Sequence, residues 1–209
     1  GERNGSSDSY DYYKIAAPSG KTSMNVAFSH DNASASGSDN SIYVYKYIAE
    51  GNTPAVQYFD SNDGVDDNRT FGIVAGSTYY ILVDVNSAFG NSSSGYTRYR
   101  YGLRASFGTE VYELEQNNST TTAQSITAGT TYIGAYDGSG VDDYPYVDYF
   151  KVTATSNTMT VALSHVSALA SGSDFDVIVY DSSGNTIDSF SAEDGVNNEI
   201  ERWVTSGES

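Results

Sequence analysis

Two stretches of the chain are written to one pattern: MNVAFSHDNASASGSDNSIYVY at residues 24–45 and MTVALSHVSALASGSDFDVIVY at residues 159–180. They align without a gap at a separation of 135 residues, and the chain's two methionines and two histidines fall at matching positions inside them. In the second stretch Met159, Val161 and Leu163 alternate with small or polar residues, which is the pattern of a strand with one buried face. We therefore expect one strand arrangement to occur twice.

The match continues on both sides of these stretches. Upstream, DYYKI at residues 11–15 faces DYFKV at 148–152, and downstream, IVAGST at 73–78 faces VTSGES at 204–209. A period near 135 residues is too long for a solenoid unit and has the size of a domain. The chain is therefore expected to hold two copies of one domain type.

Neither copy is complete within this chain. We place the first copy at residues 1–111 and the second at residues 112–209. The first lacks a counterpart of the lead-in at residues 112–134, and the second lacks counterparts of the strands between residues 79 and 103. Missing strands leave edges and core positions that proteins normally cover. The chain is expected to be either a window of a longer tandem array or a subunit whose ends are covered by strands of its neighbours.

Segments rich in β-branched and aromatic residues, with turn clusters on either side, indicate strands at Ser41–Ile48, Thr78–Val85 and Tyr96–Leu103. Phe175–Phe190 is expected to form a hairpin with SSGN at its turn. No segment has a convincing helical period. The expected fold class is all-β, with two tandem antiparallel β-sandwich domains of jelly-roll-like type, each incomplete within this chain.

The composition of the chain bounds its function. Of its 209 residues, 38% are hydrophobic and 13% aromatic, which is enough apolar surface for a core. A net charge of −17 repels nucleic acid and anionic membranes and suits a cationic partner or divalent cations. There is no cysteine, and no apolar run approaches the roughly 20 residues of a membrane span. We expect no nucleic-acid partner and no membrane insertion.

Five motifs follow one another in a recognisable order across the two partial copies. They are YELEQNN (112–118), YIGAYDGSGVDDYPYVDYFKV (132–152), MTVALSH (159–165), SDFDVIVYDSSGNT (173–186) and VAGSTYYILVDV…GYTRYRYGL (74–103). This order resembles the bacterial pre-peptidase C-terminal (PPC) domain family, which includes the collagen-binding domains of clostridial collagenases. The resemblance implies non-catalytic β-sandwich modules that ride on secreted enzymes or repeat in surface proteins. It also implies an extracellular or cell-surface location.

The resemblance further implies a calcium site. In the collagen-binding branch, a Glu-x-Glu-x-Asn-Asp lead-in and aspartates before the D-Y-x-F strand hold Ca2+. The matching positions here are Glu113, Glu115, Asn117, Asn118, Asp142, Asp143 and Asp148. Asn118 replaces an aspartate of the family pattern, which lowers the ligand charge. Carboxylate and amide oxygens suit Ca2+, and alternation along an extended segment would put Glu113 and Glu115 on one face. The alternative interpretation is a solvated acidic strand and loop.

The two histidines do not indicate an enzyme. Adjacent residues on a strand, such as Ser29 and His30, point to opposite faces and so do not pair as nucleophile and base. One histidine per copy also makes a zinc site a poor prediction. We expect each histidine to end its strand and cap the following loop. A metal held by Asp174 and Asp176 is disfavoured as a shared feature, because Ser41 stands at the position of Asp176 in the first copy.

The stretch YTRYRYGLR at residues 96–104 holds three of the ten basic residues. We predict a partner-binding surface made of Tyr96, Arg98, Arg100 and Arg104. A face of tyrosine and arginine is typical of contact surfaces, and here it would suit an acidic patch of a neighbouring subunit. Sugar stacking on the tyrosines is a competing interpretation. The third is an exposed face that keeps an edge strand soluble.

These patterns predict a non-catalytic, extracellular structural or adhesive protein that works in a longer array or in a head-to-tail fibre of its own copies. The alternative is a pair of modules that bind collagen or polysaccharide and are attached to a secreted hydrolase.

Overall fold

A computed structural model describes residues 2–3, 10–30, 39–46, 55–62, 67–86, 99–134, 147–164, 174–193 and 198–207. Within these ranges the chain is all-β, as expected, and no helix is long and apolar enough to cross a membrane. The contacts divide the chain into two compact units, Gly1–Gln124 with Thr131–Tyr149 and Ser125–Thr130 with Phe150–Ser209. This division groups residues 112–124 and 131–149 with the first unit, whereas the sequence repeat assigns them to the second copy.

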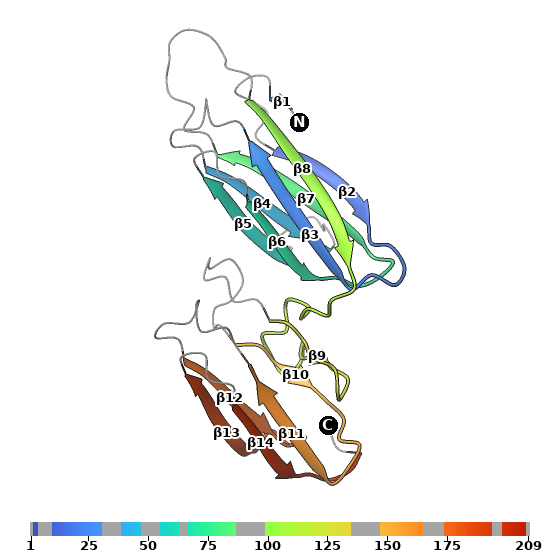
Figure 1. Ribbon diagram of the computed structural model, residues 1–209, viewed down its shortest axis with the longest axis vertical. Coiled ribbons are helices and arrows are strands. Elements are labelled where there is room, and N and C mark those ends of the chain that lie inside the picture. The colour runs from blue at the N-terminus through green and yellow to red at the C-terminus, as the bar shows by residue number, and fades with distance from the viewer. Residues whose placement is uncertain are drawn as a thin grey trace. The chain divides into compact units, whose positions relative to one another are not determined.

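The first unit contains two four-stranded antiparallel sheets (Figure 1). The first sheet has the order β1-β8-β3-β6, with β1 at Glu2–Arg3, β8 at Tyr99–Gly108, β3 at Ser23–His30 and β6 at Asp67–Gly72. The second sheet has the order β2-β7-β4-β5, with β2 at Tyr10–Ala16, β7 at Thr78–Asn86, β4 at Asp39–Tyr45 and β5 at Gln57–Asn62. The strands predicted near residues 41–48, 78–85 and 96–103 correspond to β4, β7 and β8.

The core of the first unit lies between these two sheets. Alternate side chains of β3 and β7 point inward, and Val26 and Phe28 from β3 meet Ile81 and Val83 from β7 in one apolar cluster. All four are no more than 2% exposed. Burying one such side chain stabilises the fold by about 1.5–3 kcal/mol. The two sheets therefore form a β-sandwich with a single core.

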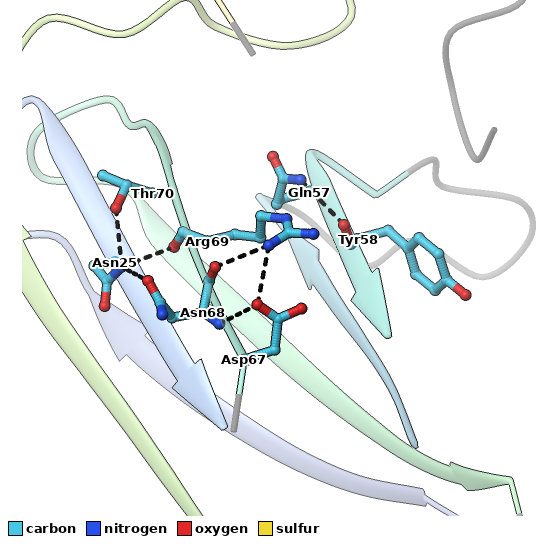
Figure 2. Close-up of polar contacts among 7 residues, drawn as sticks. All are labelled: Asn25, Gln57, Tyr58, Asp67, Asn68, Arg69 and Thr70. Carbon is cyan, nitrogen blue, oxygen red and sulfur yellow. Dashed lines mark hydrogen bonds and ion pairs between the residues drawn. The ribbon is translucent and has the colours of Figure 1, made fainter. Parts of the chain in front are cut away.

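A polar cluster on the outer face of the first sheet ties β6 to β3 (Figure 2). The Asn25 side-chain nitrogen donates to Asn68 Oδ1 at 3.2 Å and to Thr70 Oγ1 at 2.9 Å. Arg69 forms an ion pair at 3.0 Å with Asp67, two residues earlier on the same strand. The two bonds of Asn25 join side chains of different strands that the observed register brings opposite each other, so they favour that register.

The second unit contains smaller sheets (Figure 1). β11 at Thr158–Leu163 pairs with β14 at Asn198–Trp203, and β12 at Asp174–Tyr180 pairs with β13 at Thr186–Glu193. Both pairs are antiparallel. The remaining strands, β9 at Gln124–Ser125 and β10 at Phe150–Lys151, pair with each other.

The hairpin predicted at residues 175–190 is confirmed as β12-β13. Its turn is held by Asp181, whose Oδ1 accepts hydrogen bonds from the backbone N–H groups of Ser183 and Asn185 at 2.9 and 2.8 Å. Hydrogen bonds from Asn185, with the side-chain bond the largest cause, lower the pKa of Asp181. An aspartate side chain at a turn commonly accepts a hydrogen bond from the backbone N–H two residues later, and this is why the sequence predicts a turn here.

Candidate functional site

The candidate metal centre is built on the lead-in segment, residues 112–134. Two backbone hydrogen bonds close this segment: the Glu113 N–H donates to Ile133 O, and the Ile133 N–H donates to Val111 O, each at 2.9 Å. Tyr112 and Ile133 form an isolated parallel bridge. The first residues of the lead-in segment therefore make one bridge, where the sequence suggested a longer extended strand.

The lead-in segment lies against the end of β6 at Gly72. A Cβ atom added to Gly72 would overlap the carbonyl oxygen of Glu113, and would lie 2.9 Å from its carbonyl carbon and 3.0 Å from Tyr112 O. Cβ atoms essentially never come closer than 3.0 Å to such neighbours, so glycine fits this position and other residues do not. Through this contact β6 positions the backbone from which Glu113 projects.

The Glu113 side chain is buried, with 4% exposed. Its carboxylate faces Gly134, where an added Cβ would lie 3.3 Å from Oε1 and 3.5 Å from Oε2. A buried carboxylate is costly unless a cation or several hydrogen-bond donors compensate its charge. In a chain with a net charge of −17, a bound cation is a suitable compensating group.

Asn117 is 1% exposed, and its backbone oxygen accepts a hydrogen bond from the Tyr149 N–H at 2.8 Å. Both polar atoms of its side chain, Oδ1 and Nδ2, are buried, and no hydrogen-bonding group of the described residues reaches them. Leaving a buried amide unsatisfied costs about 1–3 kcal/mol. A Ca2+ ion bound to Oδ1 would offset part of this cost, because side-chain amide oxygens are regular calcium ligands.

The backbone is strained at the residue before Asn117. Gln116 has a φ of 77°, and it is the one non-glycine residue with positive φ among the described residues. The left-handed conformation costs such a residue about 1–2 kcal/mol. Strain of this kind is concentrated at ligand sites and turns that the surrounding structure holds in place. Here it lies directly beside Asn117.

The structure brings together part of the predicted ligand set. Glu113 and Asn117 are buried, Glu115 and Asn118 are half-buried, Asp148 is exposed beside Tyr149, and Asp142 and Asp143 lie outside the described residues. No three Asp, Glu, His or Cys side chains in the described ranges form a group that could hold a metal. A calcium site here would depend on amide and backbone oxygens together with the carboxylates of Glu113 and Glu115.

The first copy assigns a structural role to the position of Asp148. Its equivalent there is Asp11 on β2, which accepts a hydrogen bond from the Tyr101 hydroxyl on β8. The Tyr13 and Tyr101 hydroxyls are 2.6 Å apart. Burial, followed by the hydrogen bond to Asp11, raises the pKa of Tyr101. In the first copy this aspartate therefore ties the two sheets together.

The predicted tyrosine–arginine surface is only partly described. Tyr96 and Arg98 lie outside the described residues, and Arg100 is described by its backbone, which pairs with Glu2 of β1. Arg104 is exposed on β8, between Leu103 and Ala105, which pack against the core. Arg104 therefore points away from the core, and the partner-binding role of the four residues stays a prediction.

Sequence reasoning missed a second aromatic surface, on the outer face of the β2-β7-β4-β5 sheet. We call it the tyrosine surface, and it consists of Tyr10, Tyr12, Tyr43, Tyr45, Tyr58 and Tyr80. The register places Tyr12, Leu82, Tyr43 and Tyr58 in one row across the four strands. The Tyr43 ring centre lies 6.2 Å from that of Tyr45 and 4.8 Å from that of Tyr58.

The tyrosine surface combines exposed rings with carboxylates. Tyr10 and Tyr12 are 53% and 61% exposed. The Tyr58 hydroxyl donates to Asp60 Oδ1 at 2.5 Å, and burial, followed by this bond, raises the pKa of Tyr58 to about 12. Rings that offer a flat apolar face beside hydrogen-bonding groups are typical of contact and ligand surfaces.

One hydrogen-bonded pair is kept in both copies with its two residues exchanged. In the first unit Ser41 on β4 donates to Asp60 Oδ1 on β5 at 2.8 Å. In the second unit Ser191 on β13 donates to Asp176 Oδ1 on β12 at 2.6 Å. Ser41 and Asp176 are equivalent in the repeat, as are Asp60 and Ser191. The exchange gives Asp176 a cross-strand role and accounts for the serine at its position in the first copy.

His30 lies at the end of β3, as expected, and is buried. Its ring centre is 5.8 Å from that of Phe28, and its register partner on β8 is Tyr101. His165 lies outside the described residues. Packing against aromatic core residues suits a scaffold position, and the lack of catalysis stays an expectation.

No model of a known protein family matches the chain, and no curated protein matches it. The resemblance to the PPC family, and the calcium ligands it implies, therefore rest on the order of the five motifs.

Proposed function

We propose that the chain is a non-catalytic, extracellular structural or adhesive protein. It would be a subunit or repeat segment of a fibre or surface array, completed by strands that neighbours share with it. The observation that carries this proposal is a difference in burial between two copies of one strand arrangement. Val26 and Phe28 on β3 are no more than 1% exposed, whereas their equivalents on β11, Val161 and Leu163, are half-buried.

The same difference separates β4 from β12. Ile42 and Val44 are fully buried, whereas their equivalents Val177 and Val179 are half-buried. Covering the remaining apolar surface would stabilise the second unit by about 25 cal/mol per Å². Surfaces of this kind on a soluble protein usually mark sites of interaction. The proposal is that the second copy becomes a complete sandwich when a neighbour covers it.

Mass spectrometry and electron microscopy of the native material test the proposal. Filaments or ordered arrays are expected. A polypeptide of about this chain's length supports subunits completed by neighbours, and a much longer one supports a repeat segment of an array. A monodisperse, stably folded monomer consisting of these residues alone would contradict both versions.

The tyrosine surface favours the second candidate function, a pair of modules that bind collagen or polysaccharide and are attached to a secreted hydrolase. Pull-down on insoluble polymers tests it. Tyr12→Ser should reduce retention several-fold, because this ring is 61% exposed and forms one end of the row. Tyr180→Ser, an exposed tyrosine of the second unit, is the control. Filaments without retention on any polymer would remove this candidate.

We also propose Ca2+ as the ion held by the lead-in segment. Binding to the folded state alone stabilises by about 2.7 kcal/mol at 100 times the dissociation constant. Excess chelator should therefore lower the melting temperature of the wild-type chain by about 5–10 °C. Glu113→Gln should abolish this response, whereas Glu110→Gln, at an exposed neighbouring position, should preserve it. A melt that chelator leaves unchanged counts against the site.

A further inference from the structure

The chain contains a short motif that the proposed function leaves unexplained, the sequon Asn-x-Ser/Thr. The asparagine of this motif can carry an N-linked glycan in an exported protein, provided that the middle residue is not proline. The six sequons of the chain begin at Asn4, Asn32, Asn68, Asn91, Asn117 and Asn118. The motif also occurs by chance, so the exposure of each asparagine decides which position can hold a glycan.

Three of these sequons begin at described residues, and their asparagines differ in exposure. Asn117 is 1% exposed, and Asn118 is half-buried. Asn68 is exposed on β6. A glycan is bulky and polar, so its asparagine must reach solvent in the folded chain. Among the described sequons, the one at Asn68 meets this condition.

The polar cluster around Asn25 orients the amide of Asn68 (Figure 2). The Asn25 Nδ2 donates to the backbone carbonyl of Arg69 at 3.3 Å, so this nitrogen faces β6. Its partner on Asn68, at 3.2 Å, must then be the acceptor Oδ1. The Asn68 Nδ2, to which a sugar would be attached, is left to face solvent. A glycan on Nδ2 leaves Oδ1 as an acceptor and is therefore compatible with the bond from Asn25.

The third residue of the sequon, Thr70, belongs to the same cluster. Residues two apart on a strand lie on one face, so Thr70 and Asn68 share the outer face of the sheet. The Thr70 Oγ1 accepts a hydrogen bond from Asn25 Nδ2 at 2.9 Å. Asn25 thus binds the side chains of both sequon residues that define the motif.

The sequon lies on an edge strand. The order of the sheet is β1-β8-β3-β6, so β6 is its last strand among the described residues. The side of β6 away from β3 presents backbone N–H and C=O groups that can bind another strand. An oligosaccharide attached at residue 68, within a strand that spans Asp67–Gly72, is bulky enough to cover this side.

The second unit carries charge at the corresponding place. β14 is the equivalent of β6, and the register puts Glu199 at the position of Asn68 and Glu201 at the position of Thr70. Both glutamates are exposed. Charged side chains are one of the means by which an edge strand avoids pairing with another chain. The copy that lacks the sequon therefore has two carboxylates in its place.

We propose that Asn68 carries an N-linked glycan and that this glycan covers the open edge of β6. The inference rests on the proposed function in one respect, which is that the chain is exported. In the transfer, Nδ2 loses a proton and forms a bond to the anomeric carbon of a sugar. The donor is an oligosaccharide linked to a lipid phosphate. Its bond between the anomeric carbon and the phosphate oxygen breaks, and the lipid phosphate leaves with the electron pair.

Mass spectrometry of the native protein, digested on the N-terminal side of aspartate, tests the site. This digestion yields the peptide of residues 67–83, in which Asn68 begins the only sequon. The peptide should carry the added mass of an oligosaccharide, and its fragments should place that mass on Asn68. Asn117 should be unmodified because it is buried. A 67–83 peptide without sugar would overturn the inference, and a glycan on Asn117 would overturn the exposure argument that supports it.

Two variants of Thr70, made in the organism that produces the native protein, isolate the sequon. Thr70→Ser keeps the motif and should keep the added mass on the 67–83 peptide. Thr70→Val has a similar shape but no hydroxyl, and it should lose the added mass completely. Added mass that persists in Thr70→Val would show that the sugar does not depend on the sequon, which would overturn the inference.

Sedimentation velocity of the purified full chain tests the role of the glycan at the edge. Asn68→Gln removes the glycan and should increase the fraction of laterally associated chains several-fold. Asn68→Glu, which copies Glu199 of the second unit, should return this fraction to the wild-type level. An Asn68→Gln chain that associates no more than the wild type would overturn this role. Native filaments with a bare Asn68 would remove the inference and leave the proposed function, whereas a glycosylated chain that forms no array would do the reverse.

Discussion

Replacing Gly72 with alanine tests the contact on which the lead-in segment depends. The new Cβ would overlap the carbonyl oxygen of Glu113 and lie 2.9 Å from its carbonyl carbon, whereas ordinary contacts fall between 3.4 and 4 Å. The obstacle is backbone, which cannot rotate away as a side chain can. Either β6 or the lead-in segment must move.

The loss of stability in Gly72→Ala can be estimated from the effect of overpacking a protein core. Inserting a methyl group into a filled space typically costs about 1–3 kcal/mol, and a backbone obstacle places Gly72→Ala at the upper end. For a domain of this size, each kcal/mol lowers the melting temperature by about 2–4 °C. Differential scanning calorimetry of the full chain should therefore show a loss of about 6–12 °C. The response to calcium should shrink as well, because the displaced residue is Glu113.

Gly102→Ala is the matched control. A Cβ at Gly102 would lie 2.6 Å from Ser29 Oγ, the end of a short side chain that can rotate. We expect this variant to melt within about 3 °C of the wild type, consistent with about 1 kcal/mol or less. If Gly72→Ala melted no lower than Gly102→Ala, the lead-in segment would not be seated on β6 as described.

Two further predictions concern the cross-strand networks. Ser41→Asp places a second carboxylate against Asp60 at a buried position, so it should lower the free energy of unfolding by about 1–3 kcal/mol. Adding Asp60→Ser should restore most of this loss, because the second unit already uses the exchanged pair. Chemical denaturation of both variants measures this, and a double variant no more stable than Ser41→Asp would contradict it. Raising the pH should remove the contribution of Tyr58. The folded state holds its proton more tightly than the unfolded chain, so the contribution is complete below pH of about 10 and is lost towards pH 12. Tyr58→Phe should flatten this part of the stability profile, and an identical profile would argue against the Tyr58–Asp60 bond.

The strands and their repeat could be predicted from the sequence because the patterns that indicate them are local. The alternation of Met159, Val161 and Leu163 predicted one inward face, and these residues are half-buried between exposed neighbours. The turn at Asp181 could be predicted for the same reason, since its hydrogen bonds span at most four residues. The repeat, which is gapless over residues 24–45 and 159–180, then carried β3 and β4 to their counterparts β11 and β12.

The tyrosine surface could not be predicted in this way. Alternation with Ile42 and Val44 places Tyr43 and Tyr45 on one face of β4. The row from Tyr12 to Tyr58, however, exists only because β7 lies between β2 and β4. This strand order is set by long-range pairing, which leaves no periodic signal along the chain.

The sequence predicted which residues contribute to the candidate metal centre, but it gave no indication of how they are arranged. The motif order indicated Glu113 and Asn117 as oxygen ligands. Glu113 is held by the bond to Ile133 and by the approach of Gly72, and Asn117 is held by the bond from Tyr149, all of which are contacts far away in sequence. The strain at Gln116 had no sequence signal either, because glutamine has no preference for positive φ.

The position of Gly72 is filled differently in the second copy. That residue is Trp203, which faces Thr158 on β11 as Gly72 faces Ser23 on β3, and it is 82% exposed. A lead-in seated like residues 112–113 cannot approach this position, because even a methyl group at Gly72 would overlap the Glu113 carbonyl. Exposed tryptophan is among the residues that dominate binding energy once an interface buries them. Trp203 is thus the position at which the second copy excludes the backbone contact that the first copy makes at Gly72.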